Sequence, residues 1–191
     1  MLSNDLLDIK GKVLLLVCCA PCSAGVIDFI AKNNLDFTIF FYNPNIYPEV
    51  EYVKRKEEVI RLAKLYNIPF VDTDYTPQDY VKATIGLGSF PERGKRCEQC
   101  FKLRLAKTAI YARDNKFDYF TSTLGFSRWK DLNQVNSAGY AVEELYNVPY
   151  LDVDWRKCGI QPRTQEVIKE QKIYEQKYCG CIYSLKNNKE E

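Results

Sequence analysis

The chain has 191 residues, of which 46% are hydrophobic and 14% are aromatic, and its formal net charge is +2. This length and composition are typical of one globular domain with its own core, and they exclude a disordered chain. The near-neutral charge excludes a protein whose whole surface attracts nucleic acid, so any basic binding face has to be local.

Strands and helices alternate along the sequence. The apolar run 12–17 predicts a buried strand, and Ser23 is expected to cap a helix over 24–33. Hydrophobic patterning predicts further strands at 36–42, 70–72, 117–124 and 148–153, and further helices at 49–66, 77–84, 97–115, 131–146 and 163–177. This alternation predicts an α/β fold, a mainly parallel sheet flanked by helices.

No linker or shift in composition divides the sequence. Residues 1–185 are therefore expected to form a single domain, and residues 186–191 a charged, frayed C-terminal tail. The first ten residues lack the apolar stretch of a secretion signal, and no apolar run is long enough to span a bilayer. These features predict a cytoplasmic protein without a membrane partner.

Eight cysteines and no histidine are the most unusual feature of the composition. Thiols stay reduced in the cytoplasm, so metal binding or redox chemistry is the leading explanation for so many cysteines. The absence of histidine removes the most common zinc ligand and the most common acid–base catalyst. The expected chemistry therefore depends on sulfur, carboxylate and tyrosine groups.

Seven of the cysteines fall into three groups. These groups are Cys18, Cys19 and Cys22 after the first predicted strand, Cys97 and Cys100 at the start of a predicted helix, and Cys179 and Cys181 near the C-terminus, whereas Cys158 stands alone. Ligands of parallel α/β sheets bind beyond the carboxyl ends of the strands, and the first group lies there. The sequence therefore predicts a sulfur-rich site at that edge of the sheet.

The spacing of these cysteines leaves the nature of the centre open. Four-cysteine zinc sites usually pair two Cys-x-x-Cys turns, whereas one pair here is contiguous, and this favours an iron–sulfur cluster without excluding zinc. Cys179-Gly-Cys181 would close a small, strained and therefore labile disulfide ring, or would supply two further metal ligands. The residues do not decide between these two roles.

Basic and aromatic residues surround the second cysteine group. Arg93, Lys95 and Arg96 precede Cys97, and the rings of Phe90 and Trp129 are among the aromatics nearby in the predicted fold. A basic rim with stacking rings suits an RNA loop whose bases are splayed out. Taken singly, each of these side chains is more ordinarily a solvated helix residue or a core aromatic.

Five segments carry a resemblance to a known family. CCAPCSAG, YNPNIYPEVEY, RCEQCFKLRLAKTA, FTSTLGFSRWKD and YCGCIYS resemble the motifs of epoxyqueuosine reductases of the QueH type, in order from Val13 to Ser184. The resemblance implies a Rossmann-like fold akin to adenine-nucleotide α-hydrolases. It also implies an oxidoreductase that reduces epoxyqueuosine to queuosine at the wobble position of tRNAs with GUN anticodons, the final step of queuosine biosynthesis, with electrons from an unidentified donor.

The resemblance also implies roles for individual cysteines. A [4Fe-4S] cluster would be held by Cys18, Cys19, Cys97 and Cys100, and the redox-active pair would be Cys179 and Cys181. Cys22 is a candidate ligand of a second, adjacent iron. By position alone, Asp154 is a candidate proton donor, and the tRNA-binding residues are expected to be Arg93, Lys95 and Arg96.

Two other classes of function remain open. A zinc-thiolate RNA-binding module would use the same cysteines without catalysis and would be colourless. A thiol–disulfide oxidoreductase would use Cys179 and Cys181 alone and would need no iron. Metal analysis and a visible spectrum of anaerobically purified protein separate the three classes.

Overall fold

The structure is a computed structural model that describes residues 3–157 and 159–187. Four parallel strands form one sheet in the order β3-β2-β1-β4. The strands are β1 (Val13–Leu16), β2 (Phe37–Phe41), β3 (Phe70–Asp72) and β4 (Tyr119–Ser122). Because β1 is central, the turn that follows it lies in the middle of the carboxyl edge of the sheet, which is where ligands bind in such folds.

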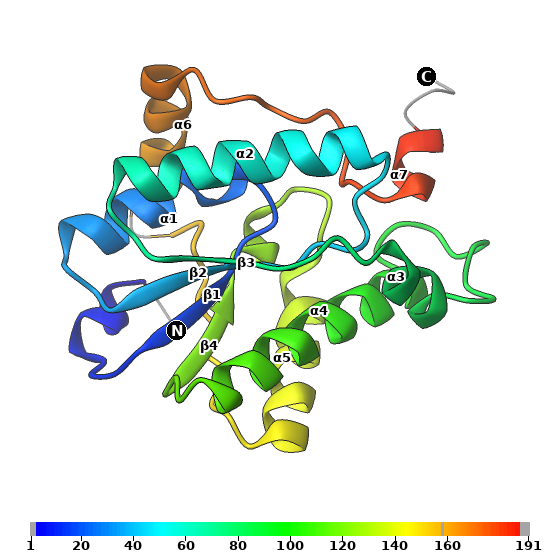
Figure 1. Cartoon of the computed structure of the whole chain (residues 1–191), viewed down its shortest axis with the longest axis horizontal. Helices are drawn as coiled ribbons and strands as arrows, with labels where there is room; N and C mark the ends of the chain where they lie inside the picture. The colour runs from blue at the N-terminus through cyan, green and yellow to red at the C-terminus, as the bar shows by residue number, and fades with distance from the viewer. Residues whose placement is uncertain (1–2, 158, 188–191) are drawn as a thin grey trace.

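Helices cover both faces of this sheet (Figure 1). The helices are α1 (Ala20–Lys32), α2 (Glu49–Leu65), α3 (Pro77–Ala83), α4 (Lys95–Asp114), α5 (Leu132–Tyr146), α6 (Ile160–Gln171) and α7 (Ile182–Asn187), with short 3-10 turns η1 (Ser3–Asp8) and η2 (Leu124–Phe126). Helices α1, α2 and α6 cover one face, and α4 and α5 cover the other. No helix among the described residues is long and apolar enough to cross a bilayer.

Strand β1 shows why the sequence forms three layers. Leu14 and Leu16 pack on the side of α4 and α5, whereas Val13, Leu15 and Val17 pack on the side of α1, α2 and α6. Successive strand side chains point to opposite faces, so a continuous apolar run is buried on both sides. The predicted α/β fold with a parallel sheet flanked by helices is confirmed.

The predicted strand at 148–153 is wrong in extent. Within this segment only Tyr150 bridges to the sheet, as an isolated parallel pair with Phe120. At this bridge the Phe120 N–H donates to the Pro149 carbonyl at 3.0 Å, and the Leu151 N–H donates to the Phe120 carbonyl at 2.9 Å. The pairing goes no further because Pro149 has no N–H to donate, the Leu151 carbonyl accepts from the Thr121 hydroxyl at 2.6 Å, and the Ser122 carbonyl accepts from Trp155 Nε1 at 3.0 Å. The segment therefore lies beside β4 without forming a fifth strand.

Three predicted helix boundaries also change. Helix α1 begins at Ala20, with Cys19 as its N-cap, and Ser23 lies inside the helix, where its hydroxyl donates to the Cys19 carbonyl at 2.8 Å. Helix α6 begins at Ile160 and ends at Gln171, before the predicted 177. Helix α7 was not predicted, and it extends into the segment expected to be a frayed tail, of which 188–191 lie outside the described residues.

Candidate sulfur-rich active site

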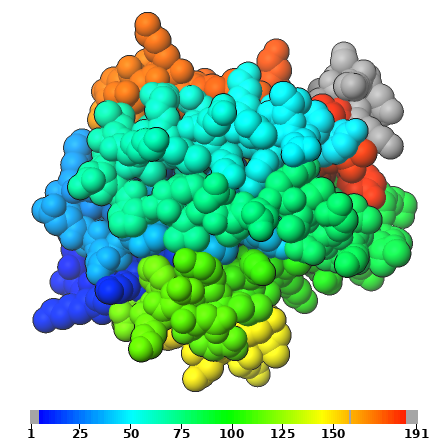
Figure 2. Space-filling view, viewed as in Figure 1, coloured from blue at the N-terminus to red at the C-terminus, as the bar shows by residue number. Residues whose placement is uncertain are grey.

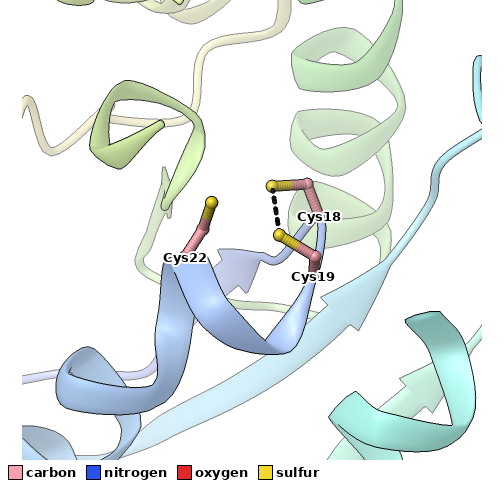
Figure 3. Close-up of side chains that lie close together, drawn as sticks. All are labelled: Cys18, Cys19 and Cys22. Carbon is pink, nitrogen blue, oxygen red and sulfur yellow. Dashed lines mark hydrogen bonds between the residues drawn. The ribbon is translucent and has the colours of Figure 1, made fainter. Parts of the chain in front are cut away.

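The turn between β1 and α1 gathers three cysteine sulfurs (Figure 3). The Sγ atoms of Cys18 and Cys19 are 3.6 Å apart, and the three sulfurs of Cys18, Cys19 and Cys22 all lie within 4.8 Å of one another. The three side chains are buried. Because α1 starts at once, Cys22 is three residues past the N-cap Cys19 and returns to the same side. Three thiols at this spacing would bind one metal centre.

The other two cysteine groups come from distant elements to the same edge. Cys97 and Cys100 lie in the first two turns of α4, and Cys100 packs with Cys181 and with Tyr80 from α3. The Sγ atom of Cys97 accepts a hydrogen bond from the Arg93 N–H at 3.3 Å. Within the described chain, Cys97 and Cys100 do not join the compact group formed by the first three cysteines.

Two buried cations compensate negative charge at the three-sulfur group. Lys130 is 7% exposed and Arg104 is 1% exposed. Hydrogen bonds with Cys19 and Cys22, together with the charges of Lys130 and Arg104, hold the pKa of Cys18 well below its ordinary value. Burial alone would lower the pKa of Lys130, but its interactions with the sulfurs of Cys179, Cys18 and Cys22 raise it. A thiolate at Cys18 therefore faces an ammonium group.

The thiols of Cys97, Cys100 and Cys179 are protonated near neutral pH in the metal-free protein. Burial raises the pKa of Cys100 to about 12, and it also raises the pKa of Cys97 and Cys179. Thiolates are the form that binds metal, so a metal entering this site would displace protons.

A buried arginine holds the Cys179-Gly180-Cys181 segment. Arg55 of α2 is 2% exposed, and its guanidinium donates to the carbonyls of Cys179 at 3.1 Å and Tyr178 at 3.2 Å. Gly180 has φ +128, a conformation that other residues resist, and a Cβ there would lie 2.9 Å from Arg55 Nη1. Cys179 and Cys181 are free thiols in this arrangement.

Three site residues were not predicted in their roles. Arg55 and Lys130 belong to basic runs expected on a solvated rim, and burial reverses that expectation. Gln176 carries no sequence signal, yet its Nε2 donates to the Cys19 Sγ at 3.0 Å and its buried Oε1 has no partner among the described residues.

The predicted tRNA-binding residues separate into two kinds. Arg93 and Lys95 are exposed, and the Nη2 of Arg93 donates to the Arg128 carbonyl at 2.7 Å. The expectation that Arg96 contacts tRNA is corrected by its burial. Its side chain is 2% exposed, donates to the carbonyls of Gly88 and Phe90, and lies 4.3 Å from the ring of Tyr183. In this conformation Arg96 supports a loop and does not face solvent.

Asp154 does not fit the role of a proton donor. Its carboxylate pairs with Arg156 at 3.3 Å and with Lys157 at 3.5 Å. Burial alone would raise the pKa of Asp154, but the hydrogen bonds and charge of Arg156, with the charge of Lys157, lower it below its ordinary value. Asp154 is therefore ionised at neutral pH and has no proton to give.

The chain is similar to proteins of one family over most of its length. The family model described as epoxyqueuosine reductase QueH matches residues 13–187. An epoxyqueuosine reductase QueH of Histophilus somni is 50% identical over 93% of this chain and 73% of its own length, and one of Haemophilus influenzae is 49% identical over 96% and 76%.

A solved structure supports the fold. The U34-tRNA thiolase NcsA from Methanococcus maripaludis, with its [4Fe-4S] cluster, superposes with a TM-score of 0.55 at 11% identity, over 95% of this chain and 64% of that chain. At this identity the likeness shows the Rossmann-like fold alone. The family match and the relatives show more, because they span nearly the whole chain: it belongs to the QueH family of epoxyqueuosine reductases.

Proposed function

We propose that this chain reduces epoxyqueuosine to queuosine in tRNAs with GUN anticodons, using a [4Fe-4S] cluster at the carboxyl edge of the sheet. The observation that carries the proposal is the group of three buried thiols, all within 4.8 Å, directly after the central strand of a chain that belongs to this family. Thiolates are the general ligands of iron–sulfur clusters, and the buried Lys130 and Arg104 suit a centre with negative charge.

Thiols are the donors that this cofactor needs. Cys18 and Cys19, with Cys97 and Cys100 from α4, would hold the cluster, and Cys22 is the candidate ligand of an adjacent iron; of these five, the described structure gathers Cys18, Cys19 and Cys22 in one compact group. When bound, the cluster would pass electrons one at a time. The superposed thiolase carries a cluster of the same type on this fold, which supports the assignment without fixing its ligands.

The reaction requires two electrons and two protons. The epoxide loses its oxygen as water, two C–O bonds break, and a carbon–carbon double bond forms. Oxidation of Cys179 and Cys181 to a disulfide would release two protons and two electrons, and this balances the reduction. An external donor would then return two electrons, and two protons from water would reform the two thiols.

The chain's own side chains would supply protons and bind RNA. With Asp154 ionised, the Sγ of Cys179 is a candidate proton donor, since burial raises the pKa of Cys179 and keeps it protonated. Arg93 and Lys95 are exposed beside the start of α4 and would contact tRNA phosphates. The expected role of Arg96 in binding is not carried forward.

The test is reduction of epoxyqueuosine-containing tRNA by protein purified under strict anaerobiosis, with dithionite as reductant. We expect a brown protein that contains iron and sulfide, and conversion of epoxyqueuosine to queuosine in nucleosides analysed by mass spectrometry. A colourless protein that contains only zinc would establish the binding module instead. Turnover of small disulfides by an iron-free protein, without conversion of the tRNA, would establish the thiol–disulfide oxidoreductase.

A further inference from the structure

A cavity of about 610 Å³ opens at one end of the molecule, apart from the three-sulfur group. Residues from three segments line it: 44–49, 75–86 and 182–183. Figure 2 shows these segments, coloured cyan, green and red, meeting at the surface beside α3 and α7. The volume is that of pockets that bind small molecules, which span roughly 300–1,000 Å³.

This cavity shares its wall with the third cysteine group. Tyr80 lines the cavity, and the same side chain packs with Cys100 and Cys181. In the lining segment 44–49, the N–H of Tyr47 donates to the Gly180 carbonyl at 2.8 Å. A molecule in the cavity would therefore lie next to the redox-active segment without occupying it.

The lining is apolar and aromatic, with one unsatisfied polar atom. Four tyrosines contribute to it: Tyr47, Tyr75, Tyr80 and Tyr183. Tyr47 is 47% exposed, so much of this residue is open to a ligand. Asn45 is only 4% exposed, and its Oδ1 has no hydrogen-bond partner among the described residues. A buried acceptor without a donor is costly, so this lining favours a flat ligand that carries an N–H group.

We propose that the cavity binds one unpaired nucleobase of the tRNA, the neighbour of the modified nucleotide. The base would stack on Tyr47, and a rotation of the buried Asn45 amide toward the cavity would let its Oδ1 accept an N–H of the base. Proteins read single-stranded RNA loops in this way, by stacking splayed bases on aromatic rings and bonding their edges. The proposal rests on the proposed function, because that function brings the adjoining nucleotide to the cysteine segment.

The test measures the affinity of the iron-loaded protein for an anticodon stem-loop RNA. Tyr47→Leu removes the stacking face but keeps the two backbone hydrogen bonds of that residue, to Gly180 and from Tyr178. We expect affinity to fall about tenfold, which is the scale of one base–aromatic stack. Tyr140→Leu is the matched control, because Tyr140 is 49% exposed on α5 and lines no part of the cavity. Its affinity should equal that of the wild type.

A second measurement identifies the base. RNAs with an abasic site immediately 5′ or 3′ of the modified position are compared on both proteins. One of the two abasic RNAs should bind the wild type about tenfold more weakly than intact RNA does. The same abasic RNA and intact RNA should bind Tyr47→Leu equally well, because both changes remove the same contact. Asn45→Leu should show the same loss of discrimination at that position.

The inference would be overturned if each abasic site weakened binding to the wild type and to Tyr47→Leu by the same factor. Turnover of full-length tRNA is followed in parallel, so the two proposals fail separately. A wild type that converts epoxyqueuosine but shows no coupling refutes the base pocket alone. A wild type that neither binds nor converts tRNA refutes the proposed function, and the base pocket with it.

Discussion

Arg55 illustrates how a single buried cation shapes the site. Its guanidinium contacts three partners at once: the carbonyls of Tyr178 and Cys179 and the carboxylate of Glu51, at 2.7 Å. Only the planar, multi-donor arginine head group makes all three bonds together, and a lysine cannot reproduce them. Arg55 is therefore a positioning residue that holds the backbone around Cys179.

Arg55→Lys is expected to loosen the Cys179 segment. The substitution keeps the charge but leaves one or two buried carbonyls without a donor, which costs about 2 kcal/mol. Urea unfolding of the metal-free protein should show this loss, and alkylation of Cys179 by iodoacetamide, followed by mass spectrometry, should become faster. The second readout distinguishes local opening from a general loss of stability.

Arg61→Lys is the matched control on the same helix. The Arg61 side chain is 41% exposed and donates to the Gln171 carbonyl at 3.0 Å and to Glu58. Stability and the alkylation rate should both stay close to wild type, because solvent can replace these contacts. Equal alkylation of Cys179 in the Arg55 and Arg61 variants would contradict the positioning role.

At the residue scale, the sequence identified the cysteines but not their supporting side chains. Clustered cysteines are rare enough to mark a site by themselves. Arg55, Arg96 and Lys130 looked like solvated surface charge, and only the tertiary fold shows that they are buried. The role of Gln176 depends on a 3.0 Å contact with a sulfur 157 positions away, which no local pattern encodes.

At the element scale, the position of α1 depends on a close approach to α6. A Cβ on Gly25 would lie 2.2 Å from Thr164 Oγ1, 2.6 Å from the Ile160 carbonyl and 2.9 Å from the Thr164 N–H. Two of these three atoms belong to the backbone of α6, so a side-chain rotation cannot relieve the contact. Because α1 carries Cys22 in its first turn, this packing also positions the site.

Gly25→Ala is expected to destabilise the protein by overpacking, by about 2 kcal/mol. The change in the free energy of unfolding is measured by urea denaturation of the metal-free protein. Thr164→Ala in the same chain removes the nearest side-chain atom but leaves the backbone of α6 in place. Gly25→Ala should therefore still destabilise the Thr164→Ala protein, but by less than it destabilises the wild type. Full recovery would show that the side chain of Thr164, and not the approach of the two helices, sets the limit.

Most elements were predictable, the short β3 and α3 included, whereas α7 was not predicted and α6 was displaced. The amphipathic patterns of α2, α4 and α5 predicted these helices to within one or two residues at each end. The six-residue α7 is too short for a periodic signal. The segment around Pro149 has the apolar character of a strand but pairs with β4 only at Tyr150, because Pro149 has no N–H and side chains bond the next carbonyls.

At the scale of the whole molecule, a parallel sheet brings distant segments to one edge. The β1–α1 turn, the start of α4 and the segment before α7 converge there, although they are separated by about 80 residues each in the sequence. The topology predicted the place of the first group, and the family resemblance implied that the other two groups join it. Which sulfurs share a metal was not, because the choice depends on side-chain positions within a few ångströms, and the compact group contains Cys22 in place of Cys97 and Cys100.

The iron content of cysteine variants divides ligands from the redox pair. Cys18→Ser and Cys97→Ser should lose iron, because each removes a proposed cluster thiolate. Cys179→Ser and Cys181→Ser should keep iron and its visible spectrum but lose turnover, since no dithiol remains to supply two electrons. Iron, sulfide and visible absorption are measured on proteins purified anaerobically, and queuosine formation is measured on the same samples.

Cys158→Ser is the control for this series, because Cys158 belongs to none of the three cysteine groups, and it lies outside the described residues. It should retain both iron and activity. The decisive comparison is between Cys181→Ser and Cys97→Ser, because Cys181 packs against Cys100 of α4. Equal loss of iron in these two variants would make Cys181 a ligand, and the electrons for the epoxide would then have to come from the metal centre alone.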